Sequence, residues 1–234
     1  MKKRTLMTLL IFFILIPATL FLCKMIPGRS YYIAALLIIC EMMFPLFFAF
    51  ENRKPQAREL VVISVLCAIA IVSRVAIPIP HFKPTFAVII LSAVALGPEA
   101  GFIIGAVTAF GSNFFAGQGA FTPWQMMSYG AGGLLAGMLS RWGLLSRKPL
   151  KLAIFGFFSV VLWVGPLLDL CVLFLAPINM SASSVMALFA SGFIPNIIQA
   201  SCTALTITLL GRPFLEKLDR IKIKYGMLED GNGL

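Results

Sequence analysis

The stretch Leu60-Val61-Val62-Ile63-Ser64-Val65-Leu66-Cys67-Ala68-Ile69-Ala70-Ile71 decides the fold class of this chain. Apolar residues stand at nearly every position of it instead of at every second one. The strands of membrane β-barrels alternate apolar and polar residues, whereas a membrane-spanning helix is apolar over its whole length. The stretch therefore predicts a helix in a membrane, and the expected fold class is an all-α integral membrane protein.

The composition of the whole chain agrees with this. Its 234 residues are 60% hydrophobic and 12% charged, with a mean hydropathy of +0.97. A soluble domain carries charge on about a quarter of its positions, so this chain could not cover a water-facing surface. Apolar runs near the length of about 20 residues that crosses a bilayer predict eight membrane spans, at about 5–23, 31–50, 59–77, 84–98, 100–116, 123–140, 151–175 and 184–210.

The predicted spans divide the chain into four parts. Residues 1–50 are expected to form an amino-terminal two-helix hairpin, 51–58 a polar cytoplasmic linker, 59–211 a six-helix core and 212–234 a basic cytoplasmic tail. The start of the chain, Met1-Lys2-Lys3-Arg4 before an apolar run, also fits a cleaved signal peptide. Because that run is long and no Ala-x-Ala site follows it, we expect it to be kept as a span.

The distribution of charge predicts the orientation. The net charge is +10, and with the amino terminus inside, all of the 19 basic residues fall on the predicted inner side except Lys24, Arg29, Arg74 and Lys83. Such a bias orients membrane proteins and favours cytoplasmic amino and carboxyl termini. Topology and contact with anionic lipid explain the basic patches better than binding to nucleic acid. The five cysteines lack metal or disulfide spacing and are expected to be small buried hydrophobic residues.

A polar segment interrupts the apolar runs at Gly117-Gln118-Gly119-Ala120-Phe121-Thr122-Pro123-Trp124-Gln125. Its aromatic rings and amides can hold a polar organic molecule at the membrane rim but are poor catalysts. Other polar residues are expected near the same outer ends of the spans, where burial makes each of them costly. Together they predict an outward-opening ligand pocket, formed by Arg74, Asn113, Asp169, Asn196, the turn at His81–Lys83 and the turn at Gln118–Gln125.

Several of these features have a second interpretation. Arg74 and Asp169 could simply neutralise one another, and Asn196 with Gln199 could be hydrogen-bonding links between helices. Small residues repeat at four-residue spacing on two faces, which favours close packing within one subunit or a groove for a partner subunit. These faces are Gly101, Gly105, Ala109 and Asn113, and Ser128, Gly132, Ala136 and Ser140. Glu41 has no evident partner in the sequence.

Sequence motifs for catalysis are missing. The chain has no GxxxxGK[ST], HExxH or GxSxG motif, and a single histidine cannot supply a metal site. We therefore expect no enzyme activity, no catalytic residue and no bound metal. A stand-alone secondary transporter, with Asp169 and Arg74 as its ion relay, is an alternative, although no inverted repeat is seen. An intramembrane enzyme using Asp169 is a weaker one.

Particular strings resemble a known family. They are Ala57-Arg58-Glu59-Leu60, His81-Phe82-Lys83-Pro84, Ala95-Leu96-Gly97-Pro98-Glu99-Ala100-Gly101-Phe102, and Ser112-Asn113-Phe114-Phe115 leading into the segment Gly117–Gln125. Over residues 57–212 the chain resembles the substrate-binding S components of energy-coupling factor (ECF) transporters. The amino-terminal hairpin departs from the six-helix core of that family.

The resemblance implies a subunit in a bacterial or archaeal cell membrane that captures a vitamin or related micronutrient, and the segment is most similar to members associated with cobalamin. The subunit would work with a transmembrane coupling subunit and two ATPase subunits, which use the ATP, while this chain binds no cofactor. The relaxed small pair Ser64 and Ala68 would contact the coupling subunit. The implied substrate-binding residues are Arg74, Phe82, Lys83, Asn113, Gln118, Phe121, Trp124, Gln125, Asp169 and Asn196.

Overall fold

The computed structural model describes residues 15, 18–19, 30–52, 55–175 and 181–226. Within these residues the chain is helical and has no strand. The helices are α3 (Ser30–Asn52), α4 (Ala57–Val75), α5 (Thr85–Leu96), α6 (Pro98–Ala116), α7 (Thr122–Arg141), α8 (Pro149–Ser159), the π-helical turn η2 (Val160–Val164), α9 (Gly165–Leu175) and α10 (Ala182–Lys224). The predicted all-α class is confirmed for this part of the chain, while the predicted span 5–23 lies almost wholly outside it.

Three helical segments of the described residues are long and apolar enough to cross a membrane. They are Pro98–Ala116, Pro149–Phe174 and Ala182–Lys224. The second combines α8, η2 and α9 into one continuous helix with a π-helical turn, where an extra residue is accommodated. The predicted boundaries at 100–116, 123–140 and 151–175 lie within two residues of the observed helix ends.

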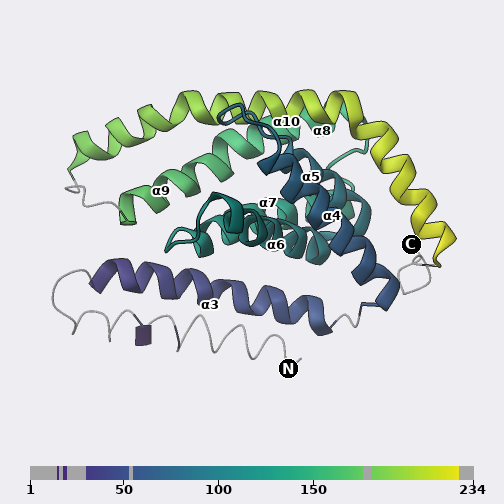
Figure 1. Ribbon diagram of the computed structural model, residues 1–234, viewed down its shortest axis with the longest axis horizontal. Coiled ribbons are helices and arrows are strands. Elements are labelled where there is room, and N and C mark those ends of the chain that lie inside the picture. The colour runs from purple at the N-terminus through teal and green to yellow at the C-terminus, as the bar shows by residue number, and fades with distance from the viewer. Residues whose placement is uncertain (1–14, 16–17, 20–29, 53–54, 176–180, 227–234) are drawn as a thin grey trace.

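Helix α5 is shorter than the span expected at 84–98. Its 12 residues rise about 18 Å, less than the roughly 30 Å of a hydrocarbon core. Every residue of α5 is buried, because α4, α6, α7, α8 and α10 pack around it. The apolar character that suggested contact with lipid instead reflects contact with protein on all sides, and α5 forms the centre of the bundle (Figure 1).

Helices α6 and α7 approach each other closely. A Cβ atom on Gly105 would lie 2.4 Å from the carbonyl oxygen of Tyr129, and one on Gly133 would lie 2.3 Å from the carbonyl oxygen of Gly101. Only glycine permits backbones to approach this closely. The predicted α6 face, with Gly101 and Gly105, therefore packs against α7 within one subunit. The predicted α7 face does not meet it: a Cβ on Gly132 would meet the ring of Phe86 of α5, and Ser128 Oγ donates to the carbonyl oxygen of Val164.

The two ends of the described chain add further elements. Helix α3 packs against α6 and α7, with the rings of Phe47 and Phe102 edge to face at 5.5 Å. Thr19, in a short described stretch before α3, donates a hydrogen bond of 2.5 Å from Oγ1 to Glu41 Oε1, a partner that the sequence did not suggest. Helix α10 continues through the expected boundary at 211 to Lys224, and its C-terminal part bends away in Figure 1. A proline within a helix, here Pro213, is an ordinary cause of such a bend.

Candidate functional site

Hydrogen bonds join the C-terminal ends of α4 and α6 to the N-terminal end of α7. The guanidinium group of Arg74, in the last turn of α4, donates to Ser112 Oγ at 2.5 Å and to Gln125 Oε1 at 3.3 Å. Its Cζ atom lies 5.4 Å from the centre of the Tyr129 ring, a distance suited to a cation–π contact. Residues of three helices thus meet at the positively charged guanidinium group of Arg74, beside the polar segment Gly117–Gln125.

Asn113 continues this network. Its Nδ2 donates to Gln125 Oε1 at 2.8 Å and to Thr122 Oγ1 at 3.1 Å. Thr122 Oγ1 in turn donates to Gln118 Oε1 at 2.9 Å, and Gln118 Nε2 donates to the carbonyl oxygen of Phe110 at 3.0 Å. We call the connected side chains the amide cluster: Arg74, Ser112, Asn113, Gln118, Thr122 and Gln125.

The local sequence explains why this cluster forms. Gly117 ends α6 with a φ of 104°, a conformation that residues other than glycine rarely adopt, and Pro123 stands in the first turn of α7. The chain therefore reverses within a few residues. This short reversal brings Asn113, near the end of α6, against Thr122 and Gln125 at the start of α7.

One polar atom of the amide cluster is buried without a partner. Asn113 is 1% exposed, and its Oδ1 accepts no hydrogen bond in the described part of the chain. Buried polar atoms are nearly always satisfied by protein, water or ligand. A hydrogen-bond acceptor therefore remains available at the centre of the cluster.

The aromatic residues of the segment pack next to the cluster. Trp124 is 7% exposed and stacks on Phe174 of α9, with ring centres 5.6 Å apart and planes 22° apart. Ile39 of α3 and Cys171 complete this apolar group, and Phe121 packs against it. Trp124 Nε1 is buried and donates no hydrogen bond in the described residues, so it offers a second unused polar atom.

Asp169 and Asn196 form a separate pair between α9 and α10. Asn196 Nδ2 donates to Asp169 Oδ2 at 3.1 Å. A Cβ on Gly192 would lie 2.5 Å from the Asp169 carboxylate, and one on Gly165 would lie 2.4 Å from the Asn196 amide. Among the ion pairs of the described residues, none joins Asp169 to Arg74, so the alternative that the two residues neutralise one another is not seen there.

A third set of contacts ties the loop between α4 and α5 to α10. Gln199 Nε2 donates to the carbonyl oxygen of Lys83 at 2.6 Å, and Lys83 Nζ donates to the carbonyl oxygen of Ile77. The half-buried Phe82 follows His81, whose φ is 57°. Gln199 lies one helical turn from Asn196 and so links this loop to the Asp169–Asn196 pair.

Sequence reasoning found most of these residues but grouped them differently. The structure joins Arg74, Asn113, Gln118 and Gln125 directly, and places Trp124 and Phe121 in the adjoining apolar group. Ser112 was not predicted as a member, and Thr122 was included only as part of the predicted turn at Gln118–Gln125. Both stand beside predicted residues in the sequence, which was the available signal. The proposed partner contacts Ser64 and Ala68 lie on the exposed face of α4.

The chain matches one family model, described as "ECF-type riboflavin transporter, S component", over residues 54–218. This range covers well over half of the 234 residues and includes the whole amide cluster. The chain belongs to this ECF S component family. Comparison with curated proteins and with solved structures gives no match.

Membership of the S component family has direct consequences. The family is one of membrane transporters and not of enzymes, in agreement with the absence of catalytic motifs. With the long apolar helices, it places the chain in a membrane. The resemblance found in the sequence is thereby confirmed, while α3 and the residues before it lie outside the matched range.

Proposed function

We propose that this chain is the substrate-capture subunit of an ECF transporter, and that it binds a riboflavin-like vitamin at the amide cluster. The matched family carries riboflavin in its description. The observation that supports this site most directly is the linked set Arg74, Asn113 and Gln125, which contains a buried amide oxygen without a partner. The pocket is expected to face the outside of the cell.

The chemistry of the cluster suits such a solute. Riboflavin combines a flat aromatic ring system, which has hydrogen-bond donors and acceptors on its edge, with a hydroxylated tail. Side-chain amides offer both donors and acceptors. In and beside the cluster, the amide oxygen Oδ1 of Asn113 is an unused acceptor and the indole Nε1 of Trp124 is an unused donor. The rings of Phe121, Trp124 and Phe174 supply an adjoining aromatic surface on which a flat ring can stack.

Cobalamin, the solute suggested by the polar segment, is the competing cargo. It is much larger than riboflavin and has no extended flat ring system free for stacking. Asn113 and Trp124 are both buried, so a solute of that size would require larger movements of α6 and α7. We therefore place riboflavin first and cobalamin second.

The proposed subunit works with partner chains. A transmembrane coupling subunit would dock on the exposed face of α4 at Ser64 and Ala68. The sequence has no nucleotide-binding loop, so ATP would be used by two ATPase subunits and not by this chain. Asp169 and Asn196 would brace α9 against α10 beside the pocket.

Uptake in cells tests this function. Cells with and without the gene are supplied with labelled riboflavin or cobalamin, and small molecules that co-purify with the protein are identified by mass spectrometry. We expect uptake of riboflavin to require both this chain and the ATPase subunits. Uptake that continues without ATPase subunits would instead support the stand-alone secondary transporter. If no solute depends on the chain, the proposed function is wrong.

A further inference from the structure

Helix α3 lies outside the residues that match the S component family, which begin at residue 54, yet it packs on the matched core against α6, α7 and α9 (Figure 1). Ile39, Met43 and Phe50 are buried and stand four and seven residues apart, so they share one face of the helix. Ile33 and Phe44 on another face are exposed. One face of α3 therefore belongs to the protein core, and another is free to contact lipid.

Ile39 is the residue of the buried face that reaches the proposed vitamin site. It is 8% exposed and belongs to the same buried apolar group as Trp124 of α7 and Cys171 of α9, against which Phe174 also packs. Met43, one helical turn further along α3, packs instead into the main core of the bundle. Two neighbouring residues of one helix face thus have different surroundings, and only Ile39 borders the aromatic group.

A flat vitamin would meet two different environments at its two edges. Riboflavin has hydrogen-bonding atoms along one edge of its ring system and two methyl groups on the opposite edge. Asn113 and Gln125 of the amide cluster suit the hydrogen-bonding edge. The apolar group that contains Ile39 and Trp124 suits the methyl groups, because burying apolar surface is favourable. The methyl edge is therefore expected to lie toward α3.

We propose that Ile39 of α3 determines which ring substituents the bound vitamin can carry. This inference rests on the proposed riboflavin site. Because Ile39 packs in one apolar group with Trp124, its size limits the room that remains beside the indole ring. One methylene group more or less in an apolar pocket changes selectivity by about 10–200-fold. A helix outside the matched family range thus supplies a specificity-determining residue.

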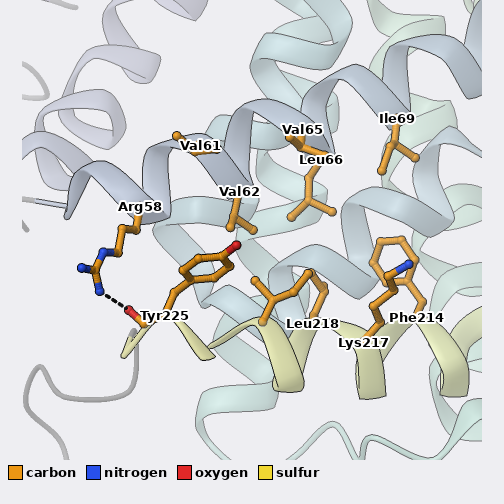
Figure 2. Close-up of a pocket in the computed structure, with 11 residues that line it drawn as sticks. Arg58, Val61, Val62, Val65, Leu66, Ile69, Phe214, Lys217, Leu218 and Tyr225 are labelled. Carbon is orange, nitrogen blue, oxygen red and sulfur yellow. Dashed lines mark hydrogen bonds between the residues drawn. The ribbon is translucent and has the colours of Figure 1, made fainter. Parts of the chain in front are cut away.

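The surface proposed for the coupling subunit is separate from this part of α3. Figure 2 shows the open apolar groove beside it, with Val61 and Val65 of α4 along one side and Phe214 and Leu218 of α10 along the other. The described residues that line the groove all come from α4 and from the end of α10 with Tyr225 after it. A substitution at Ile39 therefore leaves this groove unchanged, and its effect is read in solute binding by the purified chain.

Competition binding with the purified full-length chain tests the proposal. Labelled riboflavin is displaced by unlabelled riboflavin or by either of two analogues, in which an ethyl group replaces one of the ring methyl groups. We expect the unchanged chain to bind at least one analogue tenfold or more weakly than riboflavin. Ile39→Val removes one methyl group and should reduce this difference in affinity at least fivefold, and Ile39→Ala should reduce it at least as much.

Met43→Ala is the matched control, because it removes a buried side chain from the same face of α3 but from the main core. It should keep the discrimination between riboflavin and the analogue even where its unfolding temperature falls. Ile39→Val decides the test if Ile39→Ala fails to fold.

Three outcomes would overturn the proposal. If riboflavin binds but the analogues bind equally well, or if Ile39→Val discriminates as the unchanged chain does, Ile39 does not set the selectivity, while the proposed function stands. An equal loss of discrimination in Met43→Ala would assign the effect to loosened packing of α3. If the unchanged chain binds no riboflavin, the proposed function fails and this inference fails with it.

Discussion

At the scale of single residues, Gln125 holds the amide cluster together. Its one side-chain oxygen accepts hydrogen bonds from both Arg74 and Asn113, from the ends of two other helices. Asn113 is almost fully buried, so water cannot readily replace this acceptor. Removing the acceptor would leave two donors unsatisfied, at a cost of about 1–3 kcal/mol for each buried one.

The substitution Gln125→Leu tests this role. It keeps a similar side-chain size but removes the shared acceptor, so we expect a lower unfolding temperature in detergent and at least a tenfold loss of vitamin affinity. Gln125→Glu is the matched control, because its carboxylate can accept from both donors and should keep the unfolding temperature. Equal unfolding temperatures in Gln125→Leu and the unchanged protein would contradict the account of the cluster.

The stacking of Trp124 on Phe174 gives a second prediction at the scale of single residues. Trp124 packs on Phe174 between α7 and α9, and replacing a large buried aromatic residue with alanine costs about 3–5 kcal/mol. Trp124→Phe should keep part of this packing and fold, while Trp124→Ala should unfold at a clearly lower temperature. Fluorescence-monitored size exclusion after heating measures both. If the alanine variant is as stable as the phenylalanine variant, the packing role is wrong.

Part of this site could be predicted from residues alone. Arg74, Asn113 and Gln125 stood out because amides and charges are costly in a membrane and therefore carry information. Ser112 did not, since hydroxyl groups in helices commonly bond to their own backbone, as Ser112 Oγ does with the carbonyl oxygen of Thr108. The pairing of Asp169 with Asn196 depends on how closely α9 and α10 approach, which no local pattern gives.

At the scale of helices, the α6–α7 crossing rests on glycine. A methyl group on Gly105 would press on the backbone of Tyr129 at 2.4 Å, and backbone cannot move aside as a flexible side chain can. Gly105→Ala should therefore cost about 1–3 kcal/mol of stability, seen as a lower unfolding temperature. Gly111→Ala in the same helix is the control, because its added methyl would meet the side chain of Ile71 and no backbone atom of another described element within 4 Å. Similar unfolding temperatures for the two variants would contradict the crossing.

Hydropathy predicted helix type well but not what surrounds each helix. Helix α5 and a lipid-facing helix are both apolar, and the sequence alone does not say whether lipid or protein covers them. For the same reason the length of α10 was predicted wrongly, because the basic residues after Gly211 suggested a separate tail. Leu215 and Leu218 are buried there, so packing against the bundle continues the helix.

At the scale of the whole molecule, the charge pattern predicts that the α6–α7 loop faces outside and the α7–α8 loop faces inside. In a chain whose own cysteines are replaced, Gln118→Cys should react with a membrane-impermeant thiol reagent in intact cells. Ser146→Cys should react only after the cells are opened. Reaction of Ser146→Cys in intact cells, with Gln118→Cys protected, would reverse the orientation.

The most direct test of the central claim is a binding titration of the purified full-length chain with riboflavin, followed by quenching of flavin fluorescence. The account predicts saturable binding of one riboflavin per chain, at least tenfold weaker binding by Gln125→Leu, and near-normal binding by Gln125→Glu. A parallel titration with cobalamin is expected to show weaker binding. No saturable riboflavin binding, or equal affinity in Gln125→Leu and the unchanged chain, would contradict the proposed vitamin site at the amide cluster.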